Sequence, residues 1–588
     1  MSAYDHDPVT CVWLRQDAAS LSYSDGSEVE NRMLSILKNT EDVSTLSPQL
    51  ANAIRDWPTE YHFSSARHNL LRPFAIGPRQ RVLELGSGCG ALTRYLGESG
   101  ATVVAVEGSL PRAGITAERC RDLPNVSVYC DDLMAFEAEG SFDYVLLIGV
   151  LEWTPVFMAG DEPVGRTLSV AARYLAEDGT LLLAIENRLG LKYFNGCAED
   201  HIGIPYFGIH DLYGRGTPVT FGRAQISTYL RAAGFQEQEF FHPFPDYKLP
   251  GLILSEAGSK DVRLRQADLL LPYAGWGCQE TYHRAFDEAL VWQSIAANGL
   301  MGEFSNSFLI RARKSVSSPV DWLVKAYGRT QRHTAFLTES TITPGDGGSL
   351  EVTKRSLYPD VSTPIGLFRQ VLEDSTYLHG RLLEGDIRRA FAQGADIDDL
   401  VVPFLPWIAF LRHHEAPCTE GIPCLPGHFV DCVPANLIVG EDGELHFIDR
   451  EWICVQPVPL AWVTIRGIMI ASRSCLDNSA LAGMSCRSFI EVIASRAGLI
   501  FSEADYVAAS AMEARFHEFC YGAEKVVPDL AGMLDQEMLL FHRLSDAPAL
   551  RRQLMWHRQE LARVKATRSW RFTSPFRVAW NLGRWIMK

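Results

Sequence analysis

The segment that most constrains the fold of this chain is RVLELGSGCG, residues 81–90. Its first five residues read as a short buried strand, and the glycine-rich turn leads directly into the helix-forming sequence ALTRYLGE. Such strand–loop–helix units open α/β domains in which backbone N–H groups at the helix start approach a ligand closely. Gly86, Gly88 and Gly90 alternate, unlike the G-x-G-x-x-G spacing. From this segment alone, a tight turn in an unrelated α/β enzyme is the alternative.

Four further strands follow in the order expected for one α/β domain. TVVAVEGS carries Glu107 at its end, where a carboxylate can accept hydrogen bonds from both hydroxyls of a ribose. VSVYCDDL ends at Asp131 and Asp132, and FDYVLLIGVLEW and DGTLLLAIEN supply the fourth and fifth strands. The pattern predicts an open sheet with its ligand at the carboxyl ends of the strands.

Glu84, the G-S-G-C-G turn and the order of these strands resemble the class I S-adenosylmethionine (SAM) methyltransferases. The resemblance implies a Rossmann-like α/β domain with a seven-stranded sheet over residues 49–316, and SAM as cofactor. We place the seventh strand at NSFLIRAR, with GLILSE near residue 254 as the alternative. Residues 1–48 are polar and irregular, and we expect a partly helical extension there. The residues implied around SAM are Glu84, Gly86, Ser87, Gly88, Gly90, Glu107, Asp131, Asp132 and Gly149.

An unusual insert, residues 188–220, follows the fifth strand and is rich in aromatic residues and glycine. Because open α/β sheets bind ligands at this edge, we expect the insert to be a lid over the acceptor. Methyl transfer mainly requires alignment of the reactants and exclusion of water. His201 and Glu152 are the first candidates for a catalytic base, and a purely structural His201 inside the lid is the alternative.

The combination IENRLGLKYFNG, EDHIG and PFPDYKLP resembles a methyltransferase subfamily found with glycosyltransferases in bacterial surface-polysaccharide (O-antigen-type) assembly. This resemblance implies a glycan or lipid-linked glycan acceptor, methylated on a sugar or a phosphate group. It also implies glycosyltransferases as partners.

A second module is expected over residues 317–535. Asp431 and Asn436 have the D-x-x-x-x-N spacing of a kinase catalytic loop, and Asp449 follows a strand pair. The segment resembles the aminoglycoside-phosphotransferase and lipopolysaccharide-kinase group. That resemblance implies an α+β domain that binds ATP through Lys354. Asp431 would orient an acceptor hydroxyl, and Asn436 and Asp449 would hold magnesium.

The second module departs from the kinase pattern. His428 lies three residues before Asp431, with Phe429 where the histidine belongs, and the phosphate-covering loop reads YGRTQRH instead of a glycine-rich sequence. The chain after Lys354 leaves little room for a helix that carries a partner glutamate, for which Glu373 is the best candidate. We therefore expect a degenerate kinase-like domain with weak nucleotide binding, while a plain β-turn at DCVPAN is the alternative.

The chain ends in a basic, aromatic tail, residues 536–588. From Arg551 onward, ten Lys or Arg residues face one acidic residue, Glu560, and six Trp or Phe residues lie among them. This composition is typical of a helix that lies on an anionic membrane surface, and docking on the acidic body of the protein is the alternative. SWRFTSPFR also resembles the tail of many bacterial polysaccharide glycosyltransferases.

Composition limits the setting of this activity. The formal net charge of −16 argues against binding of nucleic acid by the body of the protein. The thirteen cysteines show no C-x-x-C pair, which favours reduced thiols, and the N-terminus lacks a signal pattern. We expect a cytoplasmic SAM-dependent methyltransferase of surface-polysaccharide synthesis, located at the inner face of the cytoplasmic membrane if the tail binds lipid. A bifunctional kinase and methyltransferase that caps a glycan end, or a scaffold for glycosyltransferases, are the alternatives.

Overall fold

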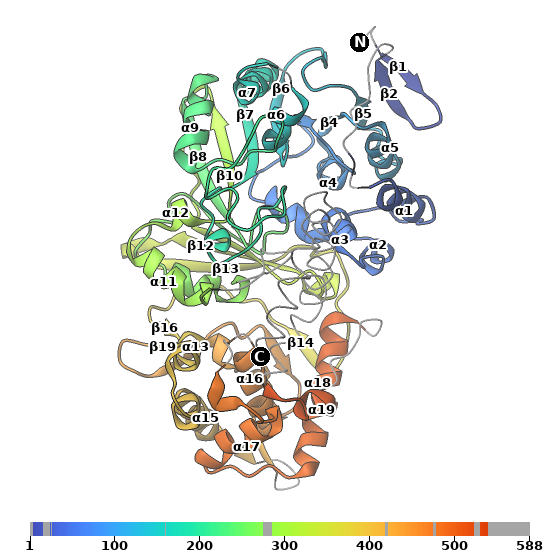
Figure 1. Cartoon of the computed structure of the whole chain (residues 1–588). Coiled ribbons are helices and arrows are strands. Elements are labelled where there is room, and N and C mark those ends of the chain that lie inside the picture. The colour runs from blue at the N-terminus through green and yellow to red at the C-terminus, as the bar shows by residue number, and fades with distance from the viewer. Residues whose placement is uncertain are drawn as a thin grey trace, which may run out of the picture.

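The computed structural model describes residues 4–15, 24, 26–158, 160–274, 285–417, 422–473, 475, 478–522 and 530–538. An α/β part occupies one end of the molecule, and a mostly helical part occupies the other (Figure 1). The predicted tail, residues 536–588, lies outside the described residues from 539 onward.

The α/β part contains the predicted seven-stranded sheet, in the order β5-β4-β3-β6-β7-β10-β8. Strand β10 pairs antiparallel with both of its neighbours, β7 and β8, whereas the strands from β5 to β7 are parallel. NSFLIRAR forms β10, as predicted, and the alternative segment forms the separate strand β9, Leu252–Leu254. The bounds are β3 Arg81–Leu85, β4 Thr102–Glu107, β5 Val126–Cys130, β6 Phe142–Ile148, β7 Leu175–Glu186, β8 Glu237–Phe244 and β10 Ser307–Arg313.

Helices cover both faces of this sheet because successive strand residues point to opposite sides. Helix α4 (Ala91–Glu98) buries Leu92 and Leu96 against one face, and α5 (Leu110–Arg119) lies beside it. Helices α7 (Pro163–Tyr174) and α9 (Arg223–Ala232) bury apolar residues at helical spacing against the other face. The connections between strands and helices therefore meet at the carboxyl edge of the parallel strands.

The N-terminal extension differs from the irregular segment that we expected. Strands β1 (Tyr4–Asp7) and β2 (Val12–Arg15) form a hairpin, and β2 pairs in parallel with β5, so the hairpin extends the sheet. Helix α1 (Ser27–Lys38) packs on α5 and supplies the expected helical portion. Helices α2 (Pro48–Asn52) and α3 (Trp57–Phe63) and the 3₁₀ helix η1 (Ser65–Leu70) then lead to β3.

The sheet continues without a break past the predicted boundary at residue 316. Strand β9 pairs with β8 on one side and with β11 (Val324–Tyr327) on the other. Strands β12 (Thr338–Pro344), β13 (Leu350–Ser356) and β15 (Ser375–Thr376) complete one fourteen-stranded sheet. Apolar residues of β9 and α11 (Glu288–Ala297) share one core with β11 and β12. The small helices beside them are α10 (Gln266–Leu270), η3 (Leu271–Tyr273) and α12 (Met301–Phe304).

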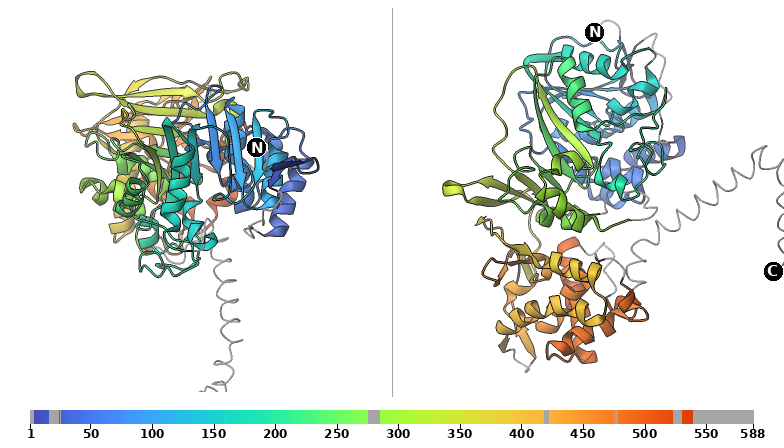
Figure 2. Two further views of the ribbon diagram at one scale, coloured as in Figure 1. Left: turned by 90° about the horizontal axis from the view of Figure 1, so that it is seen from above. Right: turned by 60° about the vertical axis from the view of Figure 1, so that its left-hand side comes forward.

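The remaining described chain forms a helical lobe, which Figure 2 shows from two further directions. Its core centres on α16 (Leu460–Arg473), which is a largely buried helix. The residues between Lys354 and α13 form no helix, as the short spacing predicted. The other main helices are α13 Leu383–Gln393, α14 Ile397–Val401, α15 Leu405–His413, α17 Cys486–Arg496, α18 Glu503–Tyr521 and α19 Leu530–Leu534.

Short strands complete the lobe in three small sheets. Strands β14 (Phe368–Gln370) and β21 (Trp452–Cys454) form one pair. The other strands are β16 Arg381–Leu382, β17 Ala416–Pro417, β18 Pro423–Leu425, β19 Leu437–Val439, β20 Leu445–Phe447 and β22 Val458–Pro459.

Two further sequence expectations can be compared with the described residues. Within them, every helix is too short or too polar to cross a membrane. Nine cysteines of the described residues are free. Cys197 and Cys424 each take part in a disulfide bond, which departs from the expectation of reduced thiols throughout.

Candidate active site

The glycine-rich turn lies between β3 and α4, and its conformation requires glycine at two positions. Gly86 has a φ of +84°, and a Cβ atom there would lie 2.4 Å from Cγ2 of Val150. Gly90 has a φ of +79°, and its Cβ would lie 3.0 Å from the backbone of Thr116 in α5. Both positions combine a left-handed backbone with close packing, which explains why the turn carries no larger side chain.

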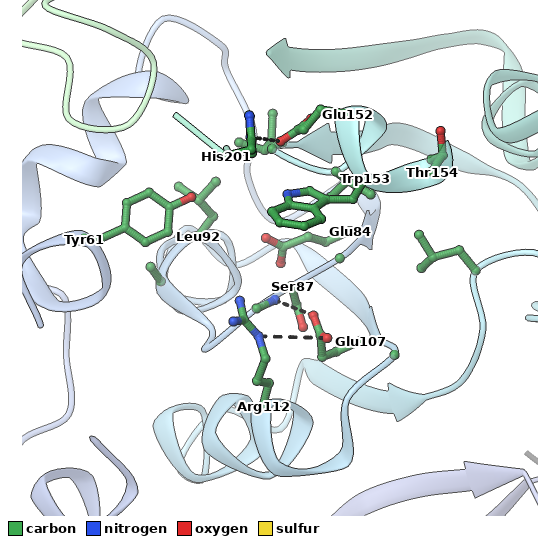
Figure 3. Close-up of a pocket in the computed structure, with 18 of the residues that line it drawn as sticks. Tyr61, Glu84, Ser87, Leu92, Glu107, Arg112, Glu152, Trp153, Thr154 and His201 are labelled. Atoms are coloured by element: carbon green, nitrogen blue, oxygen red, sulfur yellow. Dashed lines mark hydrogen bonds and ion pairs between the residues drawn. The ribbon is translucent and has the colours of Figure 1, made fainter. Parts of the chain in front are cut away.

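Glu107 at the end of β4 holds this turn in place. Its carboxylate accepts hydrogen bonds from the backbone N–H groups of Gly88, at 2.9 Å, and Ser109, at 3.0 Å. Arg112 of α5 lies 4.0 Å from the same carboxylate (Figure 3). The acidic residue therefore lies beside the turn at the sheet edge, in the position expected for contact with a ribose.

A cavity of about 460 Å³ opens beside Glu107 and the turn. It extends along the carboxyl edge of the sheet from α5 toward the lid. The sequence-predicted residues that line it are Glu84, Gly86, Ser87, Gly88, Glu107, Asp132, Gly149, Glu152 and His201. The structure thus brings most of the predicted SAM residues and both candidate bases to one cavity.

Two residues predicted to bind the cofactor have other roles. Asp131 does not line the cavity; its carboxylate accepts hydrogen bonds from Tyr4 and Arg15 of the N-terminal hairpin. Gly90 lies behind the turn and permits the close approach of α4 to α5. The assignment of both residues to SAM is therefore corrected, and Asp132 is the aspartate that faces the cavity.

Glu84 lies under the turn and is almost completely buried. Burial raises the pKa of its carboxyl group from 4.5 to about 8, and the nearby charge of Glu107 acts in the same direction. The hydroxyl of Thr93, which donates a hydrogen bond at 2.6 Å, and the charge of Arg67 oppose this shift. Glu84 is therefore largely uncharged at neutral pH in the free protein.

The far end of the cavity contains a buried group of Glu152, Glu186 and His201. Nε2 of His201 lies 3.6 Å from Oε1 of Glu152 and 3.7 Å from Oε2 of Glu186. Nδ1 of the same ring lies 3.0 Å from Oε1 of Glu199. The ring of Trp153 approaches His201 edge-on, with 5.3 Å between the ring centres (Figure 3).

Both basic and acidic side chains surround the group of Glu152, Glu186 and His201. Lys248 forms a close ion pair with Glu186 and lies 3.4 Å from Asp200. Burial opposes charge on His201, but Glu186, Glu152 and Glu199 together raise its pKa well above the usual value. Burial raises the pKa of the Glu152 carboxyl group. Lys248 holds the pKa of Glu186 below its usual value despite burial.

Glu186 and Lys248 were missed by sequence reasoning. Glu186 is the last residue of β7 and so occupies the position that Glu107 has at the end of β4, a signal that could have identified it. Lys248 lies in the connection between β8 and β9, and its side chain reaches Glu186 at the end of β7. The catalytic roles of His201 and Glu152 stay predictions.

The lid is attached to the sheet by a second set of buried charges. Nζ of Lys192, in the short helix α8 (Leu191–Phe194), lies 2.9 Å from Asp200 and 3.6 Å from Asp246. The hydroxyl of Tyr193 also donates a hydrogen bond to Asp200. These contacts fix residues 191–201 of the insert beside the cavity.

The candidate nucleotide residues of the second module also lie together. Lys354 of β13 forms an ion pair with Asp449, although 95 residues separate them. The side-chain amide of Asn436 donates to Oδ2 of Asp431 at 3.1 Å. Arg466 of α16 forms an ion pair with the other carboxylate oxygen of Asp431, and this interaction holds the pKa of Asp431 low despite its burial.

The first cavity fits SAM on structural grounds. The Oγ atom of Ser87 is buried without a hydrogen-bond partner among the described residues, and Ser87 and Gly88 both line the cavity, so this part of the turn can contact a ligand. Glu107 and Asp132 supply acceptors at two neighbouring strand ends. The turn, Glu107 and Asp132 would hold SAM, which would supply an activated methyl group.

Comparisons with known proteins agree with this assignment. Residues 59–236 match the family model described as a methyltransferase domain. No curated protein matches the chain.

Solved structures that resemble it include three methyltransferases. The first, a SAM-dependent methyltransferase and possible histamine N-methyltransferase from Thermotoga maritima, has 18% identity, covers 43% of this chain and 91% of its own, and gives a TM-score of 0.26. The second, CcbJ from Streptomyces caelestis, has 16% identity, 47% and 100% coverage and a TM-score of 0.28. The third, phosphoethanolamine N-methyltransferase 2 of Haemonchus contortus with bound SAM, has 18% identity, 42% and 52% coverage and a TM-score of 0.27.

Likenesses of this size carry no argument about the acceptor. The turn, Glu107 and the cavity lie within or beside the matched segment, which covers the strands from β3 to β7. The chain is therefore an enzyme with a methyltransferase domain in residues 59–236, and its cofactor is S-adenosylmethionine.

Proposed function

We propose that this chain methylates a sugar hydroxyl of a glycan, or of a lipid-linked glycan, in bacterial surface-polysaccharide synthesis. The observation that carries the proposal is the composition of the far end of the cavity. Trp153 lies there beside the carboxylates of Glu152 and Glu186, and Trp57 and Tyr61 also line the cavity. Aromatic faces pack on the C–H surfaces of sugars, and carboxylates accept hydrogen bonds from their hydroxyls.

The charges favour a hydroxyl over a phosphate group. Glu152 and Glu186 are both buried, and the nearest lysine, Lys248, already pairs with Glu186. A phosphate dianion beside these carboxylates would be repelled in a region of low dielectric constant.

The same residues suggest how the hydroxyl reacts. SAM, held at the turn and Glu107, would supply an activated methyl group to the hydroxyl oxygen, and the S–C bonding pair would stay on sulfur. Oε2 of Glu152 is buried without a hydrogen-bond partner and lines the cavity, so it is placed to accept the hydroxyl proton.

The experiment is methyl transfer from isotopically labelled SAM to a matched pair of oligosaccharides, one with a free terminal hydroxyl and one with a terminal phosphate. We expect label on the first only. Trp153→Ala should raise the KM for that acceptor at least about tenfold, because an aromatic stacking surface is lost, and leave SAM affinity within about twofold. Label on the phosphate would instead support the phosphate acceptor, and no label on either would reject the proposal.

A second candidate activity, phosphoryl transfer, is favoured by the ion pair between Lys354 and Asp449. This contact joins the two residues that would hold phosphate and magnesium in a kinase. However, Asp431, which would orient the acceptor hydroxyl, already forms an ion pair with Arg466. We therefore propose weak nucleotide binding without robust kinase turnover. Magnesium-dependent ATP consumption near about 1 per second, abolished in Asp431→Asn and Asp449→Asn, would overturn this view.

Membrane association through residues 536–588 is likewise a proposal, supported by the basic and aromatic composition alone. The full chain should sediment with vesicles that contain anionic lipid, and raised salt should release part of it. A chain that ends at residue 538 should stay in the supernatant; equal sedimentation of both chains would reject the proposal. A pull-down of glycosyltransferases with the same two chains would test the scaffold alternative.

A further inference from the structure

The group at the far end of the cavity has the arrangement of ligands around a metal ion. Glu152, Glu186 and His201 each offer one ligand atom, and the three atoms lie within 4.8 Å of one another. Side-chain exposure is 1% for Glu152, 0% for Glu186 and 8% for His201. They come from three separate segments, namely the start of the 3₁₀ helix η2 (Leu151–Trp153), the end of β7 and the lid. Convergence therefore results from the tertiary fold and not from a local run of acidic residues.

Two carboxylate oxygens in this group are buried and have no hydrogen-bond partner among the residues that the structure describes. They are Oε2 of Glu152 and Oε2 of Glu186. Leaving a buried acceptor unpaired costs about 1–3 kcal/mol, and more for a charged group, so a native site normally satisfies it. Both residues line the cavity, where a cation could supply the missing interaction.

The contacts behind the group orient the ligand atoms. His201 directs Nδ1 toward Glu199, which also accepts hydrogen bonds from the backbone N–H groups of His201, at 2.9 Å, and Ile202, at 2.7 Å. This leaves Nε2 facing Glu152 and Glu186. Oε1 of Glu186 is held by Lys248 and, at 3.3 Å, by the hydroxyl of Tyr247. Carboxylates that fix the second nitrogen of a histidine are typical supports of metal ligands.

The distances distinguish a metal site from a simple hydrogen bond. The separations of 3.6 and 3.7 Å from Nε2 to the two carboxylates exceed normal hydrogen-bond lengths. Ligand atoms at about 2.0–2.2 Å from one metal ion lie about 2.8–3.1 Å apart at octahedral angles and about 3.3–3.6 Å apart at tetrahedral angles. The two distances to Nε2 are close to the tetrahedral range, and all three ligand atoms lie within 4.8 Å of one another.

We propose that Glu152, Glu186 and His201 bind a divalent transition-metal ion, of the Mn²⁺ or Zn²⁺ type, at the acceptor end of the methyl-transfer cavity. Two carboxylates with one imidazole suit these ions better than they suit Mg²⁺ or Ca²⁺, which prefer oxygen ligands alone. Three protein ligands leave coordination positions open toward the cavity. The role of the ion rests on the proposed function: the ion would bind the acceptor oxygen and orient it for methyl transfer.

The first test measures metal binding without any acceptor. The full chain, treated with a chelator and then dialysed, is titrated with MnCl₂ while free Mn²⁺ is followed by electron paramagnetic resonance, and with ZnCl₂ by calorimetry. We expect one ion per chain for at least one of the two metals. Glu186→Gln and His201→Ala should each weaken binding at least about 100-fold, and Glu199→Gln about 10–100-fold, because Glu199 only orients the ring.

Glu107→Gln is the matched control, since it changes another buried carboxylate in the same cavity. It should lower SAM affinity and leave the metal stoichiometry unchanged. Glu186→Gln should instead weaken metal binding and leave SAM affinity unchanged. Thermal melting and SAM binding show whether each variant is folded. Absence of a bound ion in the wild-type chain, or equal metal affinity in wild type, Glu186→Gln and His201→Ala, would overturn the proposal.

The outcomes also separate this inference from the proposed function. A bound ion together with no methylation of glycan hydroxyls would support the metal site and reject the proposed acceptor. Methylation of a glycan that continues unchanged in excess chelator, with no ion bound, would support the acceptor and reject the metal site. Binding of an organic ammonium ion in place of either metal would indicate that the carboxylates recognise an amine, and would also reject the metal site.

Discussion

At the scale of single residues, the cavity depends on carboxylates that have different surroundings. Glu107 binds the N–H groups of the turn, Glu84 is buried beneath it, and Asp131 is directed away toward the hairpin. Three acidic residues near one cofactor site thus have three distinct roles. Each role leads to a different expected effect of substitution.

Glu107→Ala should weaken SAM binding at least about tenfold. The change removes the acceptor expected for the ribose hydroxyls, and hydrogen bonds to charged groups contribute roughly 1.5–3 kcal/mol each. It also releases the N–H groups of Gly88 and Ser109. Calorimetric titration with SAM measures the effect. Asp131→Asn is the control and should keep wild-type affinity, so a loss of affinity there with none in Glu107→Ala would reverse the two assignments.

Stability of the SAM-free protein should fall as pH rises from about 5 toward 8 because of Glu84. Its pKa is raised from 4.5 to about 8 on folding, so folding favours the protonated form. This contribution is complete below pH 4.5 and is lost as the pH rises through about 8. Arg67, Glu107 and Thr93 are the groups that face it.

Glu84→Gln is uncharged at every pH, so its melting temperature should fall less than that of the wild type between pH 6 and pH 8.5. Differential scanning calorimetry of both proteins at the two pH values gives the comparison. If the melting temperatures of both proteins fell by the same amount, Glu84 would titrate near its ordinary pKa.

At the scale of elements, the N-terminal hairpin is fastened to β5 by buried charge. The side chain of Asp131 is 1% exposed and pairs with Arg15, whose Nε lies 2.9 Å away. Tyr4 also donates to this carboxylate. The hairpin is therefore joined to the sheet by side-chain contacts as well as by the parallel pairing of β2 with β5.

Arg15→Ala should lower the free energy of unfolding by about 1–3 kcal/mol, because it leaves a buried carboxylate without its cation. Arg32→Ala is the matched control. Arg32 pairs with Asp56, but the two side chains are 46% and 37% exposed, so the loss should be within about 1 kcal/mol. Urea unfolding of the three proteins measures both values, and equal losses would show that burial of Asp131 gives no advantage.

The elements that sequence reasoning predicted are those with local signals. The turn at residues 86–90 and the strand that ends at Glu107 carry their own glycine and apolar patterns, and β10 forms at the predicted segment NSFLIRAR. The hairpin was not recognised, because β1 and β2 are four residues each and depend on pairing with β5. Lys248 was missed for a similar reason, since its partner Glu186 lies 62 residues away in sequence.

At the scale of the whole molecule, one sheet joins the methyltransferase part to the second module. Leu252 and Leu254 of β9 and Trp292 of α11 share a core with Val324 and Ile342. The η1 region is also linked to the end of β13, because Arg72 contacts Tyr358. The module boundary that the methyltransferase resemblance implied near residue 316 therefore crosses a shared core.

A chain that ends at residue 316 should be less stable than the full chain. It loses β11 and β12, and each large apolar residue removed from such a core costs about 2–5 kcal/mol. We expect a melting temperature at least about 10 °C lower, or insolubility. A chain that ends at residue 538 keeps every described contact and should melt as the full chain does. Unchanged melting of the shorter chain would show that the modules fold independently.

The N-terminal hairpin forms one edge of the large sheet. A sheet of fourteen strands has two free edges, formed here by β1, with four residues, and β15, with two. β1 carries Asp5 and Asp7 among its four residues, so an approaching strand would find a short and negatively charged template. Short, charged edges oppose strand addition between molecules. Without the hairpin, the apolar strand β5 would form that edge, so the hairpin is expected to oppose strand addition there.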